Sequence, residues 1–183
     1  TTKNIVDYIK NLDKHIIFLS TDKVFDGSEI FPNEDSEIKP LGCMGKYKAM
    51  SEDYIMDNMK KFHILRLPVV HDFGKPQTNS FLDEAIINIR NKNRVNVFSN
   101  VERCFVSINE LVELLKILIS NENYGLYNTG SKIYSYYNRV IYMCEKIDIS
   151  YLDLIDSTIG NVFPVVQNLN TTKLKENINF NFS

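Results

Sequence analysis

Glycine is scarce in this sequence, and its placement excludes one common kind of binding site. The 183 residues include seven glycines, and none falls in a G-x-G-x-x-G pattern. That pattern cradles the pyrophosphate of a dinucleotide, because only glycine lets the backbone approach it closely. The first predicted element is also a helix, whereas a doubly wound nucleotide-binding domain opens with a strand. The sequence therefore lacks the phosphate-binding part of such a domain.

Cysteine and histidine are also sparse. Cys43, Cys104 and Cys144 are odd in number and widely spaced, with no C-x-x-C pair, and the three histidines do not cluster with them. This pattern argues against a disulfide framework and against a metal site built by the protein. It predicts a reducing compartment, which we take to be the cytoplasm.

Strong charge and long apolar runs are missing too. The formal net charge is −2 and the pI is about 5.9, so no general attraction to nucleic acid is expected. No apolar run approaches the ~18 residues of a membrane helix, and no signal peptide opens the sequence. We therefore expect neither a nucleic acid nor a membrane as partner. The hydrophobic fraction of 44% is sufficient for a well-formed core.

What the sequence does contain is an alternation of strand and helix patterns. Alternation at this spacing is typical of βαβ units, so we predict an α/β fold with a mostly parallel sheet. Helical spacing of apolar residues predicts helices over 1–12, 45–61, 80–92, 107–120, 135–147 and 170–178. Short apolar runs predict strands over 15–20, 62–70, 94–98, 125–131 and 150–157, and Pro68 closes the second of these.

The first predicted strand ends in three polar residues, Ser20, Thr21 and Asp22. Ligands of open α/β sheets bind outside the carboxyl ends of the strands, so this ending places hydroxyls and a carboxylate in a binding crevice. Two simpler interpretations remain open. Thr21 could form a local hydrogen bond at the strand end, and Asp22 could be a turn residue.

Five motifs resemble, in order and spacing, the extended short-chain dehydrogenase/reductases. They are "IIFLSTDKVFDG", "PLGCMGKYKAMSE", "ILRLPVVHDFG", "ERCFVSINEL" and "GLYNTGS". The dTDP-4-dehydrorhamnose reductase branch is the most similar, since its members carry S-T-D-x-V-F-D-G after the same strand. The resemblance implies roughly the C-terminal two-thirds of a Rossmann-like doubly wound parallel sheet, with a smaller substrate-binding lobe. We expect a partial Rossmann-like core over residues 1–73, and over 74–183 a mixed lobe with segments that return to the core.

The resemblance also implies a reaction, the reduction of a nucleotide-linked 4-keto sugar with NADP or NAD. A strand-end hydroxyl holds the sugar, a helix tyrosine passes the proton, and a lysine four residues later lowers the pKa of that tyrosine and binds the nicotinamide ribose. Thr21 and Lys48 match the hydroxyl and the lysine. Other implied contacts are Ser20, Leu67, Pro68 and Val69 to the cofactor, and Asp22, Asn79 and Arg103 to the substrate.

Several of these positions have structural interpretations that compete with the functional ones. Lys48 could be an ordinary exposed lysine, and Asn79 could cap a helix. Arg103 matches an arginine that binds diphosphate, although Cys104 follows it where the related enzymes have aspartate. For Arg66 in "ILRLP" we prefer a structural ion pair, and for Cys43 a thiol without a catalytic role.

Met44 occupies the position of the tyrosine, and a thioether can neither donate nor accept the proton. Tyr47 is about 100° from Lys48 around the helix, so it does not replace the tyrosine. Together with the missing glycine-rich part, this favours weak or absent hydride transfer. A non-catalytic sugar-nucleotide-binding or regulatory subunit is therefore the alternative hypothesis.

The resemblance further implies a homodimer formed through the first helix and the 45–61 helix. Ile9, Met50 and Tyr54 could supply the apolar contact, or the same residues could face the sheet.

Overall fold

The computed structural model describes residues 1–73, 80–161, 164 and 166–183. A parallel sheet forms its centre, in the strand order β1-β2-β7. These strands span Ile16–Thr21, Phe62–Leu67 and Gly125–Asn128. The predicted α/β fold with a Rossmann-like parallel sheet is confirmed, and every strand pair of this sheet is parallel.

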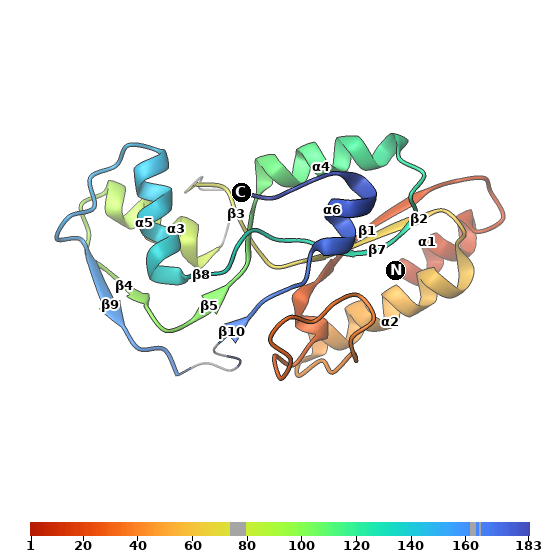
Figure 1. Ribbon diagram of the computed structural model, residues 1–183, viewed down its shortest axis with the longest axis horizontal. Helices are drawn as coiled ribbons and strands as arrows, with labels where there is room; N and C mark the ends of the chain where they lie inside the picture. The colour runs from red at the N-terminus through yellow and green to blue at the C-terminus, as the bar shows by residue number, and fades with distance from the viewer. Residues whose placement is uncertain (74–79, 162–163, 165) are drawn as a thin grey trace.

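Helices cover both faces of the central sheet (Figure 1). On one face lie α1 (Thr2–Ile9) and α2 (Cys43–Asn58), and on the other α4 (Ile108–Ser120) and α6 (Thr172–Ile178). Neighbouring residues on a strand point to opposite faces, so Ile64 packs toward α1 and α2 while Leu65 packs toward α4 and α6. Burial on both sides explains why the strands are continuous apolar runs.

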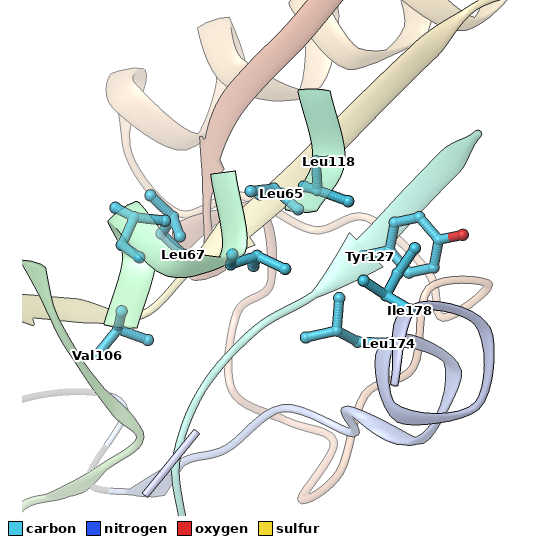
Figure 2. Close-up of a cluster of buried hydrophobic side chains, with 9 residues drawn as sticks. Leu65, Leu67, Val106, Leu118, Tyr127, Leu174 and Ile178 are labelled. Carbon is cyan, nitrogen blue, oxygen red and sulfur yellow. The ribbon is translucent and has the colours of Figure 1, made fainter. Parts of the chain in front are cut away.

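The larger of the two clusters that flank this sheet lies under α4 and α6. Figure 2 shows Leu65 and Tyr127 from the sheet beside Leu118 of α4 and Leu174 and Ile178 of α6. The capping box predicted for α4 is present. The Ser107 hydroxyl accepts a hydrogen bond from the Glu110 backbone, and the Glu110 carboxylate accepts one from the Ser107 backbone.

A second group of elements lies to one side of the central sheet (Figure 1). It contains α3 (Phe81–Arg90), β4 (Val95–Phe98), α5 (Tyr136–Lys146) and β9 (Ile155–Thr158). These elements have a hydrophobic cluster of their own, in which Leu82, Ile86, Val97 and Met143 are buried. Ser135 caps α5 as predicted, by accepting a hydrogen bond from the Asn138 backbone.

Pro68 closes the strand predicted over residues 62–70, as expected from the sequence, and the residues after it form a second strand. β2 ends at Leu67, and β3 (Val69–His71) pairs with β6 (Phe105–Ser107) and not with the central sheet. Proline has no backbone N–H to donate, so the ladder breaks there and the chain leaves the sheet.

The structure has four further short elements. The 3-10 helix η1 (Asp22–Val24) follows β1, and three strands lie where the chain passes between the two groups: β5 (Glu102–Arg103), β8 (Tyr134–Ser135) and β10 (Val166–Gln167). The sequence patterns did not predict these elements, because each is too short to show a period. The division at residue 73 stays a prediction.

Candidate functional site

A cavity of about 810 Å³ opens at the carboxyl ends of β1 and β2. This is the edge at which open α/β sheets bind ligands. The walls come from the strand ends, the start of α2 and the second group of elements. The lining residues are Thr21, Asp22, Lys23, Phe25, Leu41, Gly42, Cys43, Met44, Gly45, Pro68, Val69, Phe81, Phe98, Val101, Arg103, Tyr136, Pro164 and Gln167.

Thr21 and Asp22 form the polar end of the cavity. The Thr21 hydroxyl donates a hydrogen bond to Oδ1 of Asp22, with a distance of 3.2 Å. Asp22 is 5% exposed, and burial raises the pKa of its carboxyl from 3.8 to about 6. Gln167 holds the backbone here by donating to the Asp22 carbonyl at 2.8 Å.

Arg103 lies in the wall that β5 contributes. Its guanidinium donates to the carbonyl oxygens of Glu102 and Pro164, each at 2.6 Å. Burial lowers the pKa of Arg103, but a guanidinium keeps its charge at any physiological pH. A fixed positive charge therefore faces the same cavity as the Asp22 carboxyl.

Aromatic rings complete the wall on the side of the second group. Phe81 stacks on Phe98 with ring centres 6.0 Å apart, and its edge meets the Tyr136 ring at 5.6 Å. Burial raises the pKa of the Tyr136 hydroxyl. A broad apolar surface with a few polar groups is typical of small-molecule sites.

The start of α2 forms the opposite wall. Gly45 permits a close approach to η1, because a Cβ atom there would lie 2.1 Å from the carbonyl oxygen of Lys23. Met44 lines the cavity and is 54% exposed, and it occupies the position at which the resemblance implies a tyrosine. Cys43 beside it is exposed and forms no disulfide.

Lys48 does not line the cavity. Its Nζ atom donates to the carbonyl oxygen of Leu19 at 2.5 Å and lies 4.6 Å from the centre of the Phe18 ring. Thr21 lines the cavity and Lys48 reaches the neighbouring stretch of β1, so the structure does not bring these two candidates into one pocket. Their catalytic roles stay predictions.

Some of the other candidate residues line the cavity and others do not. Pro68 and Val69 line the cavity, whereas Leu67 is buried in the core cluster beneath α4. The Ser20 hydroxyl points to the carboxylate of Glu52. Asn79 lies outside the described residues, and Ser80 caps α3 by accepting a hydrogen bond from the Asp83 backbone.

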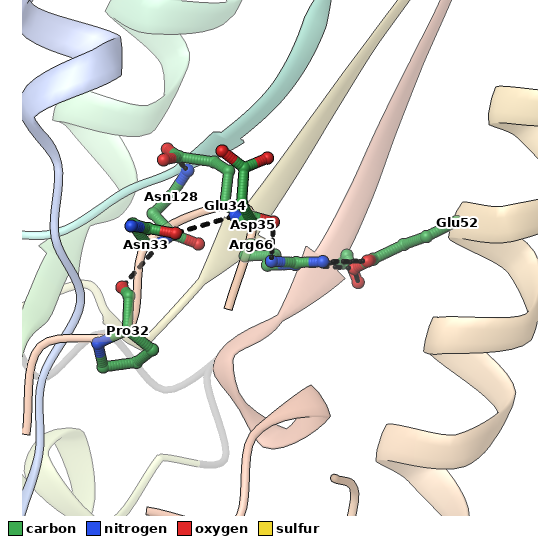
Figure 3. A network of polar contacts seen from close by, with 8 residues as sticks. Pro32, Asn33, Glu34, Asp35, Glu52, Arg66 and Asn128 are labelled. Carbon is green, nitrogen blue, oxygen red and sulfur yellow. Dashed lines mark hydrogen bonds and ion pairs between the residues drawn. The ribbon is translucent and has the colours of Figure 1, made fainter. Parts of the chain in front are cut away.

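The ion pair expected for Arg66 is present and buried. Arg66 Nη2 lies 2.8 Å from Glu52 Oε2, and the two side chains are 3% and 1% exposed. Figure 3 shows this pair together with the loop over residues 25–42, where Arg66 Nη1 donates to the Glu34 carbonyl. Asn128 at the end of β7 donates to the Pro32 carbonyl of the same loop. The network therefore fixes the loop that joins Asp22 to α2 against the strand ends.

Two other features, a metal site and a membrane-spanning helix, are absent from the part of the chain that the structure describes. The structurally described residues contain no group of three His, Cys, Asp or Glu side chains placed to hold a metal ion. None of the helices in the described ranges is both long and apolar enough for a membrane span.

Sequence reasoning missed much of the cavity wall. Phe81, Phe98, Tyr136 and Gln167 line it and were not candidates. Phe81 and Tyr136 each follow the serine that caps a helix, so each lies in the first turn of that helix. This position was the one local signal in the sequence that could have marked them as candidates.

Comparisons with known proteins identify the family and the fold. The family model "RmlD substrate binding domain" matches residues 1–148. A comparison with curated proteins finds no significant match. Among solved structures, dTDP-4-dehydrorhamnose reductase from Bacillus anthracis str. Ames, in complex with NADP, superposes with a TM-score of 0.84 at 15% identity. The reductase from Yersinia enterocolitica gives 0.85 at 15%.

A third structure, MoeE5 in complex with UDP-glucuronic acid and NAD, gives a TM-score of 0.79 at 16% identity. The superposition covers 99% of this chain and 66% of each of the two reductases, and 100% of this chain and 64% of MoeE5. At these identities the likeness shows a shared Rossmann-like fold. On the match over residues 1–148, the chain belongs to the RmlD substrate-binding domain family.

Proposed function

We propose that this chain forms the substrate-binding part of an NAD(P)-dependent enzyme that reduces a nucleotide-linked 4-keto sugar, as dTDP-4-dehydrorhamnose reductases do. The observation that carries the proposal is the cavity at the strand ends, which joins the Thr21 hydroxyl and Asp22 carboxyl to the Arg103 guanidinium. Its volume of about 810 Å³ suits a ligand of this size.

Each end of the cavity suits one part of such a substrate. The Thr21 hydroxyl can donate to a sugar carbonyl or hydroxyl oxygen. Arg103 can pair with a diphosphate, because a planar guanidinium forms two parallel hydrogen bonds to phosphate oxygens. Phe81 and Tyr136 offer ring faces of the kind on which a nucleobase packs. A nucleotide sugar is thus the proposed small-molecule partner.

The residues fit the nicotinamide end of a dinucleotide cofactor better than its diphosphate end. Pro68 and Val69 line the cavity beside Thr21, where a flat ring could pack. Within the described residues no glycine-rich turn joins a strand to a helix, so a phosphate cradle is missing there. When bound, NADP or NAD in reduced form supplies the hydride. Lys48 would contact its ribose only after leaving the Leu19 carbonyl.

Calorimetric titration with dTDP-glucose and with NADPH tests the proposal. We expect dTDP-glucose to bind and Arg103→Met to weaken it by about 10- to 100-fold, the loss of a charge-assisted pair. Arg94→Met is the matched control, because Arg94 is exposed and pairs with Asp156 on the surface. No binding of either ligand would refute the proposal.

The second candidate is a non-catalytic subunit that binds a sugar nucleotide. It is favoured by Met44, which lines the cavity and whose thioether has no proton to give. Binding of the nucleotide sugar without turnover in the presence of NADPH supports this candidate, whereas turnover supports the enzyme.

Met44→Tyr separates the two candidates further. If the cavity is still arranged for chemistry, this substitution raises the reduction of a dTDP-4-keto sugar by NADPH. Met50→Tyr is the control, because Met50 is exposed on the same helix and does not line the cavity.

A further inference from the structure

The carboxyl group of Asp22 is unusually placed for a charged side chain. It is 5% exposed, lies at the floor of the cavity and accepts a hydrogen bond from the Thr21 hydroxyl at 3.2 Å. Of the described residues that line the cavity, Asp22 is the one carboxylate. Since burial raises its pKa to about 6, a modest change in its surroundings decides its charge near neutral pH.

The surroundings of Asp22 contain more than one element. Thr21 of β1 donates its hydrogen bond, Lys23 lies beside it in η1, Arg103 faces it from β5, and Tyr136 of α5 lies close enough to interact electrostatically. Cys104 also interacts with Asp22, but burial raises the pKa of its thiol to about 11, so it is neutral. Arg103 and Lys23 are the two positive charges, and both favour the ionised carboxylate.

Arg103 is the larger of these two influences. It is also the residue that faces a diphosphate in the proposed function. A bound diphosphate adds negative charge opposite Asp22, offsets the field of the guanidinium and removes water from the cavity. Each of these changes disfavours a carboxylate.

We propose that binding of a nucleoside diphosphate group at Arg103 makes Asp22 take up one proton, so that the occupied cavity holds a neutral carboxylic acid beside the Thr21 hydroxyl. The inference rests on the proposed function, because it requires the diphosphate to bind at Arg103. A protonated Asp22 can donate to Thr21 or to a sugar oxygen, and an ionised one cannot. Substrate binding thereby supplies a proton to a cavity in which Met44 provides none.

Proton uptake has a measurable consequence, because affinity and pH become linked. Calorimetry at pH 7 with UDP-glucose or dTDP-glucose, in buffers of low and high ionisation enthalpy, gives the number of protons bound per ligand. The sugar esters are suitable probes because their diphosphate has no group that titrates near neutrality. We expect roughly 0.5–1 proton taken up per ligand, and affinity that falls as pH rises above about 6.

Two variants assign the proton to its residue. Asp22→Asn abolishes the uptake and flattens the pH dependence of affinity. Asp57→Asn removes an exposed carboxylate of α2 and should leave both the proton uptake and the pH dependence of affinity unchanged. Infrared difference spectra of the unmodified protein give a second measurement, in which the ligand makes a protonated carboxyl band appear.

The outcomes separate this inference from the proposed function. Binding without proton uptake overturns the inference and leaves the proposed function standing. Uptake that persists in Asp22→Asn also overturns it, since another group then takes the proton. If neither nucleotide sugar binds, both proposals fail.

Discussion

Replacing Glu52 with glutamine tests what holds the strand ends in place. Three interactions meet at this carboxylate: Arg66 pairs with it at 2.8 Å, the Arg66 Nε atom donates to it at 3.1 Å, and the Ser20 hydroxyl donates to it. Glutamine keeps the shape of the side chain but removes its charge. The guanidinium of Arg66 is then left buried without its counter-ion.

The expected cost follows from the burial of the pair. Breaking a buried ion pair by removing one partner costs about 3–5 kcal/mol of unfolding free energy, because the remaining charge stays out of water. Exposed pairs contribute little. With a urea m-value of about 3 kcal/mol per M, the unfolding midpoint falls by roughly 1–1.7 M.

Urea unfolding followed by circular dichroism measures this loss. Glu113→Gln is the matched control, because Glu113 pairs with Lys116 on the surface of α4, where both side chains are more than 60% exposed. We expect no measurable change for that variant. A loss of unfolding free energy below about 1 kcal/mol for Glu52→Gln would refute the reasoning, because the Arg66 guanidinium would then remain buried without its counter-ion at little cost.

Three further predictions concern other parts of the chain. Gly45→Ala should destabilise the fold and displace α2 from η1, because its Cβ would lie 2.1 Å from the Lys23 carbonyl oxygen; an unchanged melting temperature would contradict this. Arg139→Met should stabilise the fold by about 1–3 kcal/mol in urea unfolding, since the buried Arg139 has a hydrogen bond to His71 at Nη2 but no hydrogen-bond partner for Nε and Nη1 within the described structure. Burial lowers the pKa of both His63 and His71 from 6.5 to about 4, so the folded state binds fewer protons than the unfolded chain and stability falls as pH drops from 6.5 toward 4, by up to about 3 kcal/mol per ring. Ring-proton NMR titration should find both histidines neutral at pH 6, and midpoints near 6.5 would contradict the prediction.

The sequence predicted the central sheet well because its patterns are local. The apolar run over 15–20 and the capping box at Ser107 each depend on a few adjacent residues, and the structure has a strand at Ile16–Thr21 and the capping box at Ser107. The closure of the next strand by Pro68 is equally local, because it follows from the missing N–H of proline, and β2 does end at Leu67.

The cavity was only partly predictable. Thr21, Asp22 and Arg103 line it, and motif resemblance suggested all three. Phe81 and Tyr136 could not be found in this way, because they reach the cavity only after α3 and α5 pack beside the sheet. Such long-range packing has no signature in a short window of sequence.

Lys48 shows a different limit of the sequence pattern. Its place on α2 was predictable, but the direction of a long flexible side chain was not. In the structure its Nζ atom lies on the Leu19 carbonyl at 2.5 Å. The charge on Asp22 shows the same limit, because burial, the largest influence on its pKa, and the nearby charge of Arg103 both depend on the fold.

The proposed function requires a nucleotide sugar to bind in the cavity at the ends of β1 and β2. Backbone amide NMR of the isotopically labelled chain, titrated with dTDP-glucose, locates the bound ligand. We expect the saturable shift changes to concentrate at Thr21, Asp22, Arg103 and Tyr136. Changes confined to residues away from this cavity, or no saturable change at millimolar ligand, would contradict it.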